Sequence, residues 1–139
     1  MSRWNDAWQP LFDGFTRMKG KWPTRGWSWD TRLNCVTSSF TTELERAARG
    51  AVAEVFSQEF GSSSLARAPQ PLRDVAERSG GVRQGQLILA AGPFAGLHAF
   101  GLWWPWGDNE TISLRVGLCD VDPNREPYVR FRDVFGVSA

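Results

Sequence analysis

The spacing of hydrophobic positions changes several times along the chain, and each change predicts a different element. In residues 1–25, large apolar side chains recur at intervals of three and four, which is the spacing of a helix. Pro10 interrupts this pattern, because proline removes a backbone hydrogen bond and clashes with the preceding turn. We therefore expect a short broken helix, or an aromatic N-terminal arm with helical turns. The apolar positions are Trp4, Trp8, Leu11, Phe12, Phe15 and Met18.

From Gly26 onward the period changes to two. Apolar or aromatic residues alternate with polar ones between Trp27 and Cys35, which is typical of a half-buried strand. One strand is therefore predicted over this segment.

A helical period returns after residue 41. Thr42 and Glu45 have the spacing of a capping box, in which each side chain accepts a hydrogen bond from the other's backbone N–H. The apolar stripe behind it predicts a helix over 42–60, closed by Gly61. A second, short helix is predicted to begin at Pro71 and to end before Gly80. The stripe of the first helix comprises Leu44, Ala47, Ala48, Ala51, Val52, Val55 and Phe56.

Four further strands are predicted in the second half of the chain. The first of them is apolar throughout, which favours a position inside the sheet. Helices and strands are segregated along the chain, which favours an α+β fold: an antiparallel sheet of about five strands, with one long and one short helix packed on one face. We expect a single domain over 1–139, with an arm at 1–25 and an α+β body at 26–139. The four strands are Gln86–Ala91, Phe94–Trp104, Glu110–Cys119 and Tyr128–Phe135.

The turn-forming residues 105–109 predict a hairpin in which Trp104 pairs with Glu110. This register places Trp103 and Arg115 on one face, beside small residues, as an open platform. The last predicted strand would extend that platform with Tyr128, Arg130 and Arg132. Because side chains alternate across a strand, a slip of one residue in the register would exchange the two faces.

The composition excludes several classes of protein but gives little direct indication of a function. The 139 residues are 42% hydrophobic and 22% charged with a net charge of +1, so the charge balance does not call for a polyanionic partner. The opening Met1-Ser2-Arg3 is too polar for a signal peptide, and no apolar run approaches the length of a membrane span. Two distant cysteines, Cys35 and Cys119, are typical of reduced thiols in a cytoplasmic protein. Neither a metal site nor a cofactor is predicted, because the close-spaced ligand pair of a zinc site is absent.

The tryptophan-rich hairpin suggests a binding surface. Trp106 lies at the predicted loop tip near Asp108, and tryptophan, tyrosine and arginine dominate the energetics of protein interfaces. In the alternative interpretation, the N-terminal arm folds back and covers these aromatic residues in one large core. The leading hypothesis is a non-catalytic protein-binding module, for example an inhibitor or immunity-type protein that neutralises a partner. Its predicted binding residues are Trp103, Trp106, Asp108, Arg115, Tyr128, Arg130 and Arg132.

Two other functions stay open at this point. Residues 1–35 carry six basic and three acidic residues together with five tryptophans, and basic residues interleaved with aromatics are used by single-strand nucleic-acid binders. The third possibility is a small enzyme with a pocket around His98, using Asp120, Asp122 or a cysteine. The predicted register places His98 on the core face, where a structural role is favoured over that of a general base. The sequence pattern does not decide the oligomeric state.

Overall fold

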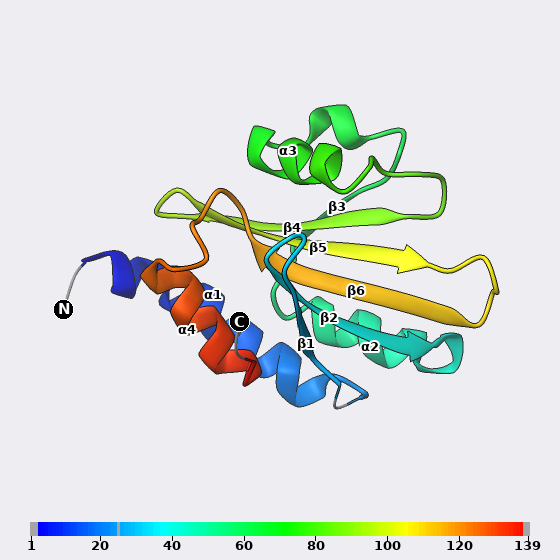
Figure 1. The fold of residues 1–139 in the computed structure, drawn as a ribbon, viewed down its shortest axis with the longest axis horizontal. Helices are drawn as coiled ribbons and strands as arrows, with labels where there is room; N and C mark the ends of the chain where they lie inside the picture. The colour runs from blue at the N-terminus through cyan, green and yellow to red at the C-terminus, as the bar shows by residue number, and fades with distance from the viewer. Residues whose placement is uncertain (1–2, 25, 138–139) are drawn as a thin grey trace.

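The computed structural model describes residues 3–24 and 26–137, and the side chains of α1 from residue 7 onward. Its centre is an antiparallel sheet in the order β1-β2-β6-β5-β4-β3, shown in Figure 1. The predicted α+β class with an antiparallel sheet is confirmed. The described residues form six strands and four α-helices, whereas about five strands and two helices were expected. The strands are β1 Ser28–Asp30, β2 Cys35–Thr41, β3 Gln58–Phe60, β4 Leu87–Phe94, β5 Leu97–Pro105 and β6 Thr111–Leu118; the helices are α1 Arg3–Lys21, α2 Glu45–Val52, α3 Gln70–Arg78 and α4 Glu126–Phe135.

Helices cover both faces of the sheet, so the expectation that they share one face is wrong. Helices α1, α2 and α4 pack with one face in a large aromatic core, and α3 packs with the other face in a smaller one (Figure 1). Strand β4 is buried on both sides, as its continuous apolar run predicted. Among the described residues, no helix is both long enough and apolar enough to cross a lipid bilayer.

The segment expected to be an arm is a continuous helix inside the main core. Pro10 is exposed on α1, where water can satisfy the carbonyl that lacks its helical partner. The helix persists because its opposite side buries Leu11, Phe12, Phe15 and Met18. At about 1.5–3 kcal/mol for each fully buried apolar side chain, this burial outweighs the lost hydrogen bond.

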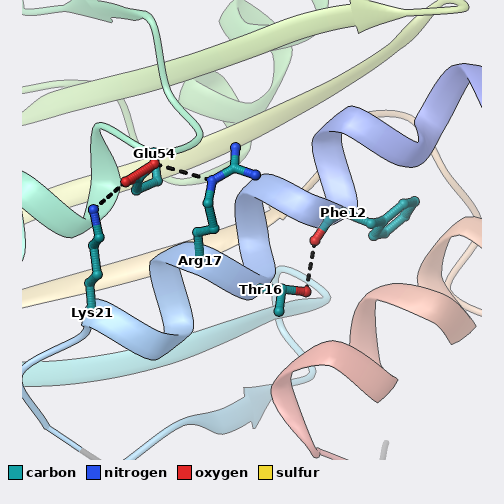
Figure 2. A network of polar contacts seen from close by, with 5 residues as sticks. All are labelled: Phe12, Thr16, Arg17, Lys21 and Glu54. Atoms are coloured by element: carbon teal, nitrogen blue, oxygen red, sulfur yellow. Dashed lines mark hydrogen bonds and ion pairs between the residues drawn. The ribbon is translucent and has the colours of Figure 1, made fainter.

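Figure 2 shows how α1 is held against the turn that follows α2. Arg17 Nε lies 3.3 Å from Glu54 Oε2, and Lys21 Nζ is paired with Glu54 Oε1. Hydrogen bonds from Lys21 and Arg17 lower the pKa of Glu54. Gly14 permits this approach, because a Cβ there would lie 3.0 Å from the Glu54 carbonyl oxygen.

The predicted strand from Trp27 to Cys35 is interrupted by a turn. Asp30 Oδ1 accepts a hydrogen bond of 2.8 Å from the Arg32 N–H, and Asn34 adopts a left-handed conformation with φ 52°. Such an Asx turn reverses the chain, so that β1 folds back onto β2. The alternation of apolar and polar residues continued through the turn and concealed it.

The predicted helix over 42–60 is much shorter in the structure. Residues Thr42–Leu44 form a 3-10 turn without a side-chain cap, so the expected capping box does not form. After Val52 the chain turns, and Gln58–Phe60 pairs with β4 as an edge strand. Pairing satisfies backbone groups of β4 that a helix would leave open. The second predicted helix is confirmed as α3, with Pro71 in its first turn.

Tyr128–Phe135 is helical in the structure, and its prediction as a strand is wrong. Tyr128, Phe131 and Phe135 follow intervals of three and four, so all three lie buried on one side of α4. Pro127 in the first turn and Gly136, with φ 67° just past the end, are typical helix boundaries.

Candidate functional site

In the observed β5–β6 register, the predicted platform does not form. Trp103 pairs with Leu114, and Leu102 pairs with Arg115. This register differs from the predicted one by three residues. Because the shift is odd, it places Trp103 and Arg115 on opposite faces, and the expectation that they share one is wrong.

Two of the predicted binding residues lie in the core. The Trp103 side chain is 3% exposed. Its ring centroid lies 5.4 Å from that of Phe40 and 5.3 Å from the Arg49 guanidinium carbon. Tyr128 is 1% exposed in α4, where its hydroxyl accepts a 2.9 Å hydrogen bond from the Leu118 N–H. A partner protein could not contact either side chain without opening the fold.

The three arginines that were predicted to bind a partner make contacts within the fold. Arg115 lies over the Trp104 ring at 4.9 Å, on the α3 side of the sheet. Arg130 lies 4.6 Å from the Phe12 ring centroid, and Arg132 lies 5.3 Å from that of Trp29. The latter two cover the edge of the core on the α1 side, so the three arginines do not form one surface.

Arg115 also pairs with Asp30, at 3.2 Å between Nε and Oδ2. Burial raises the pKa of Asp30, but hydrogen bonds from the Arg32 N–H and the Arg115 side chain outweigh it, so the net shift is downward. A carboxyl with a lowered folded pKa contributes stability above its unfolded pKa, and this contribution is lost as pH falls through the folded pKa.

We therefore expect Asp30→Asn to lower the free energy of unfolding by about 1 kcal/mol or less at neutral pH. The difference from wild type should shrink below about pH 4. Urea denaturation of both proteins from pH 7 downward measures it, and Arg115→Gln should show the same shrinking difference. A gap that stays constant into the acid range would contradict the prediction.

The β5–β6 loop retains an exposed aromatic residue. The Trp106 side chain is 53% exposed, and the backbone N–H of this residue donates to the Thr111 carbonyl at 2.8 Å. Asp108 organises the loop: Oδ1 accepts from the N–H groups of Glu110 and Thr111, and Oδ2 accepts from the Thr111 hydroxyl, each at 2.9 Å. These bonds lower the pKa of Asp108. Binding through Trp106 stays a prediction.

The aromatic and basic residues of the N-terminal segment are largely used within the fold. Trp22 is buried, and its ring centroid lies 5.0 Å from that of Trp27. Arg17 and Lys21 are paired with Glu54. The described tryptophans of this segment therefore do not form the open stacking surface that single-strand binding uses. The side chains of Arg3, Trp4 and Asp6, and the whole of Arg25, lie outside the described part of the chain.

A cavity of about 380 Å³ opens at the end of the sheet beside the β4–β5 turn. Residues far apart in the sequence line it, and two of them are joined by a 2.9 Å hydrogen bond from the Cys119 N–H to the His98 carbonyl. His98 is half-buried on the face opposite Ala99, so its predicted pairing with Val116 is wrong. The lining includes Trp8, Pro71, His98, Cys119, Asp120 and Pro127.

Unusual backbone conformations shape this end of the sheet. Gly92 has φ 109°, and a Cβ there would lie 2.6 Å from the Leu97 carbonyl oxygen, so the hairpin needs glycine. Asp120 has φ 55°, a left-handed conformation that aspartate and asparagine tolerate better than most residues. This residue turns the chain out of β6, and Pro127 in the first turn of α4 lines the cavity.

The cavity lacks an activated cysteine nucleophile. Cys119 is buried, and burial together with the nearby Asp120 charge raises the pKa of its thiol to about 12. Burial likewise raises the pKa of Cys35 to about 12. Both thiols are protonated at neutral pH, and only a thiolate attacks efficiently. Among the described residues, the His98 imidazole makes no hydrogen bond to either cysteine.

The other acidic residue predicted to act with His98 lies away from the cavity. Asp122 does not line the cavity, and its Oδ1 accepts a 2.8 Å hydrogen bond from the Asn124 N–H. No group of three or more histidine, cysteine or acidic side chains is placed to hold a metal ion within the described residues.

The sequence singled out His98 and Asp120 together but missed three walls of the cavity. Trp8 was assigned to an arm, and Pro71 and Pro127 carry no chemical signal beyond their preference for helix starts. Only their position in the fold brings them to the same opening. No protein-family model, no curated protein and no solved structure matches the chain, so its function has to be inferred from these residues.

Proposed function

We propose that the protein binds a small organic molecule in the cavity beside His98. The observation that carries this proposal is the cavity itself. Its volume of about 380 Å³ falls within the range of roughly 300–1,000 Å³ that is typical of ligand pockets. Its lining is largely apolar with a few polar groups, which is the composition that ligand sites share.

Two polar side chains are available to orient such a ligand. The His98 imidazole and the Asp120 carboxylate make no hydrogen bond within the described residues, whereas the main-chain atoms of His98 and Cys119 are already paired. A ligand would therefore gain polar contacts without breaking existing ones. The protonated Cys119 thiol supplies apolar wall and no nucleophile.

Because His98 is the single histidine of the chain, its imidazole gives one resolved reporter signal. We expect aromatic fragments, tested as a panel of neutral, cationic and anionic compounds, to shift the His98 imidazole resonance saturably in NMR titrations. Val121→Trp should abolish the shift, because residue 121 lines the cavity and a larger side chain would fill it.

Val129→Trp is the matched control, since residue 129 is exposed on α4 and does not line the cavity. Fragments should shift the His98 resonance of this variant as they do in wild type. If no fragment acts on wild type, or if Val121→Trp responds equally, the proposed binding site is wrong.

A second candidate function is the binding of a protein partner, such as the target of an inhibitor or immunity-type protein. The exposed Trp106 on a loop held by Asp108 favours it, because a large rigid aromatic side chain buries much area at low entropic cost. The platform of arginines no longer supports this function, so it rests on Trp106 alone.

An affinity capture with wild type and Trp106→Ala as paired baits tests the second candidate. A stoichiometric partner should be retained by wild type and lost by the variant, and nuclease treatment should leave it bound. Equal retention by both baits would remove Trp106 from the interface.

A further inference from the structure

We infer that the ligand of this cavity is an organic amine, with its ammonium group held by Asp120 and its apolar body packed against Trp8. This inference rests on the small-molecule site proposed above and adds the chemical class of the ligand. It follows from the charges that line the cavity, from the helix ends that border it and from its aromatic wall.

The fixed charge of the cavity is negative. Asp120 lines it, whereas no lysine or arginine is found among the described lining residues. Among all the residues that the structure describes, none forms a hydrogen bond or an ion pair with the Asp120 carboxylate. A ligand cation could therefore pair with it without displacing an internal partner.

Two helix N-termini border the cavity but offer few donors to an anion. Pro71 and Pro127, in the first turns of α3 and α4, line the opening and have no N–H. The next two N–H groups of each helix already donate to the carbonyl of the residue that precedes the helix. These bonds are Leu72 and Arg73 to Pro69, at 3.0 and 3.1 Å, and Tyr128 and Val129 to Arg125, at 3.0 and 3.1 Å.

The charged side chains of α3 that act on the Cys119 thiol do not reverse this balance. Arg78 and Asp74 on α3 both act on the Cys119 thiol, with opposite signs, and neither of them lines the cavity. Asp120 is thus the acidic side chain that a ligand would meet at the opening.

The remaining walls suit an apolar body. Trp8 contributes an indole ring, and the face of such a ring attracts cations as well as apolar groups. Leu97, Val121 and the two prolines complete an apolar lining. A primary amine on an aromatic or aliphatic ring combines both features.

The inference is tested by titrating the protein with benzylamine, benzyl alcohol and benzoate, which share one ring and differ in the charge of the substituent. The His98 imidazole resonance reports binding in each case. We expect benzylamine to bind at least about fivefold more tightly than benzyl alcohol at low salt, and benzoate to bind most weakly. Added salt should reduce the preference for the amine, since it screens exposed charges.

Asp120→Asn should remove the preference for benzylamine over benzyl alcohol. Asparagine is well tolerated at the left-handed conformation of this residue, so the turn is retained. Asp122→Asn is the matched control, because Asp122 lies two residues away and does not line the cavity.

The outcomes separate the two proposals. Equal affinity for the three compounds, tightest binding of benzoate, or an unchanged amine preference in Asp120→Asn would overturn the amine inference and leave the cavity as a ligand site. Absence of binding by all three compounds to wild type would overturn both.

Discussion

Trp103→Ala is expected to lower the free energy of unfolding by about 3–5 kcal/mol. Trp103 is buried between the sheet and α2, against Phe40 and beneath Arg49, so truncation leaves a large cavity. Trp106→Ala, three residues along the same chain segment, should change it by less than about 0.5 kcal/mol, since that side chain is largely exposed.

Urea denaturation followed by circular dichroism measures both differences. A domain of this size has a stability of about 5–15 kcal/mol, so the alanine variant can still be partly folded. Trp103→Phe provides a milder variant that should lose less than Trp103→Ala. If truncation of Trp103 were as harmless as truncation of Trp106, the β5–β6 register described above would be wrong.

Tyr128→Phe is expected to lower the free energy of unfolding by about 1–3 kcal/mol, because it leaves buried backbone groups without their partner. The hydroxyl accepts from the Leu118 N–H and lies within hydrogen-bond distance of the Leu118 and Asn34 carbonyl oxygens. It therefore ties α4 to the end of β6 and to the start of β2. Gly117 leaves room for this contact, since a Cβ there would lie 3.0 Å from the hydroxyl oxygen.

Thermal and urea unfolding of Tyr128→Phe and wild type test this role. Val129→Ala on the exposed side of α4 should change stability by less than about 0.5 kcal/mol and controls for general effects on the helix. Burial also raises the pKa of Tyr128, so the stability it contributes is present below its unfolded pKa of about 10 and is lost as pH rises above it. A phenylalanine variant as stable as wild type would show that these bonds contribute nothing.

These two residues also show why the binding surface predicted from the sequence did not form. Tryptophan and tyrosine dominate interfaces and cores alike, so residue type alone does not distinguish the two. Trp103 and Tyr128 lie in the core, and of these three residues only Trp106 is exposed. The cavity beside His98, which the sequence supported less strongly, is where residues far apart in the sequence meet.

Local chemistry was sufficient for part of the fold. The continuous apolar run of Leu87–Ala91 predicted a strand inside the sheet, because a strand buried on both faces needs no polar positions. Pro71 marked the start of α3, since proline fits the first turn of a helix at little cost. The predicted helices and strands were enough to indicate an antiparallel α+β fold, although the observed elements are less segregated along the chain than expected.

Elements whose conformation depends on distant partners could not be predicted in this way. Residues Gln58–Phe60 have helical spacing with the preceding stripe, but the open edge of β4 draws them into the sheet. The spacing of Phe131 and Phe135 in the sequence is compatible with an alternating strand. In the structure their rings pack against Phe15 of α1, and this packing favours the helix. Tertiary contacts override propensity because they bury more area than local structure does.

The sequence by itself determined the fold class, the interior strand and the short helix α3, since these follow from patterns within a few neighbouring residues. Only the tertiary structure decided the β5–β6 register, the strand-to-helix change at α4 and the cavity. Trp8, Pro71, His98 and Asp120 meet there although they are spread over the whole chain. Such a site depends on how the helices pack at one end of the sheet, and that packing is a property of the whole core.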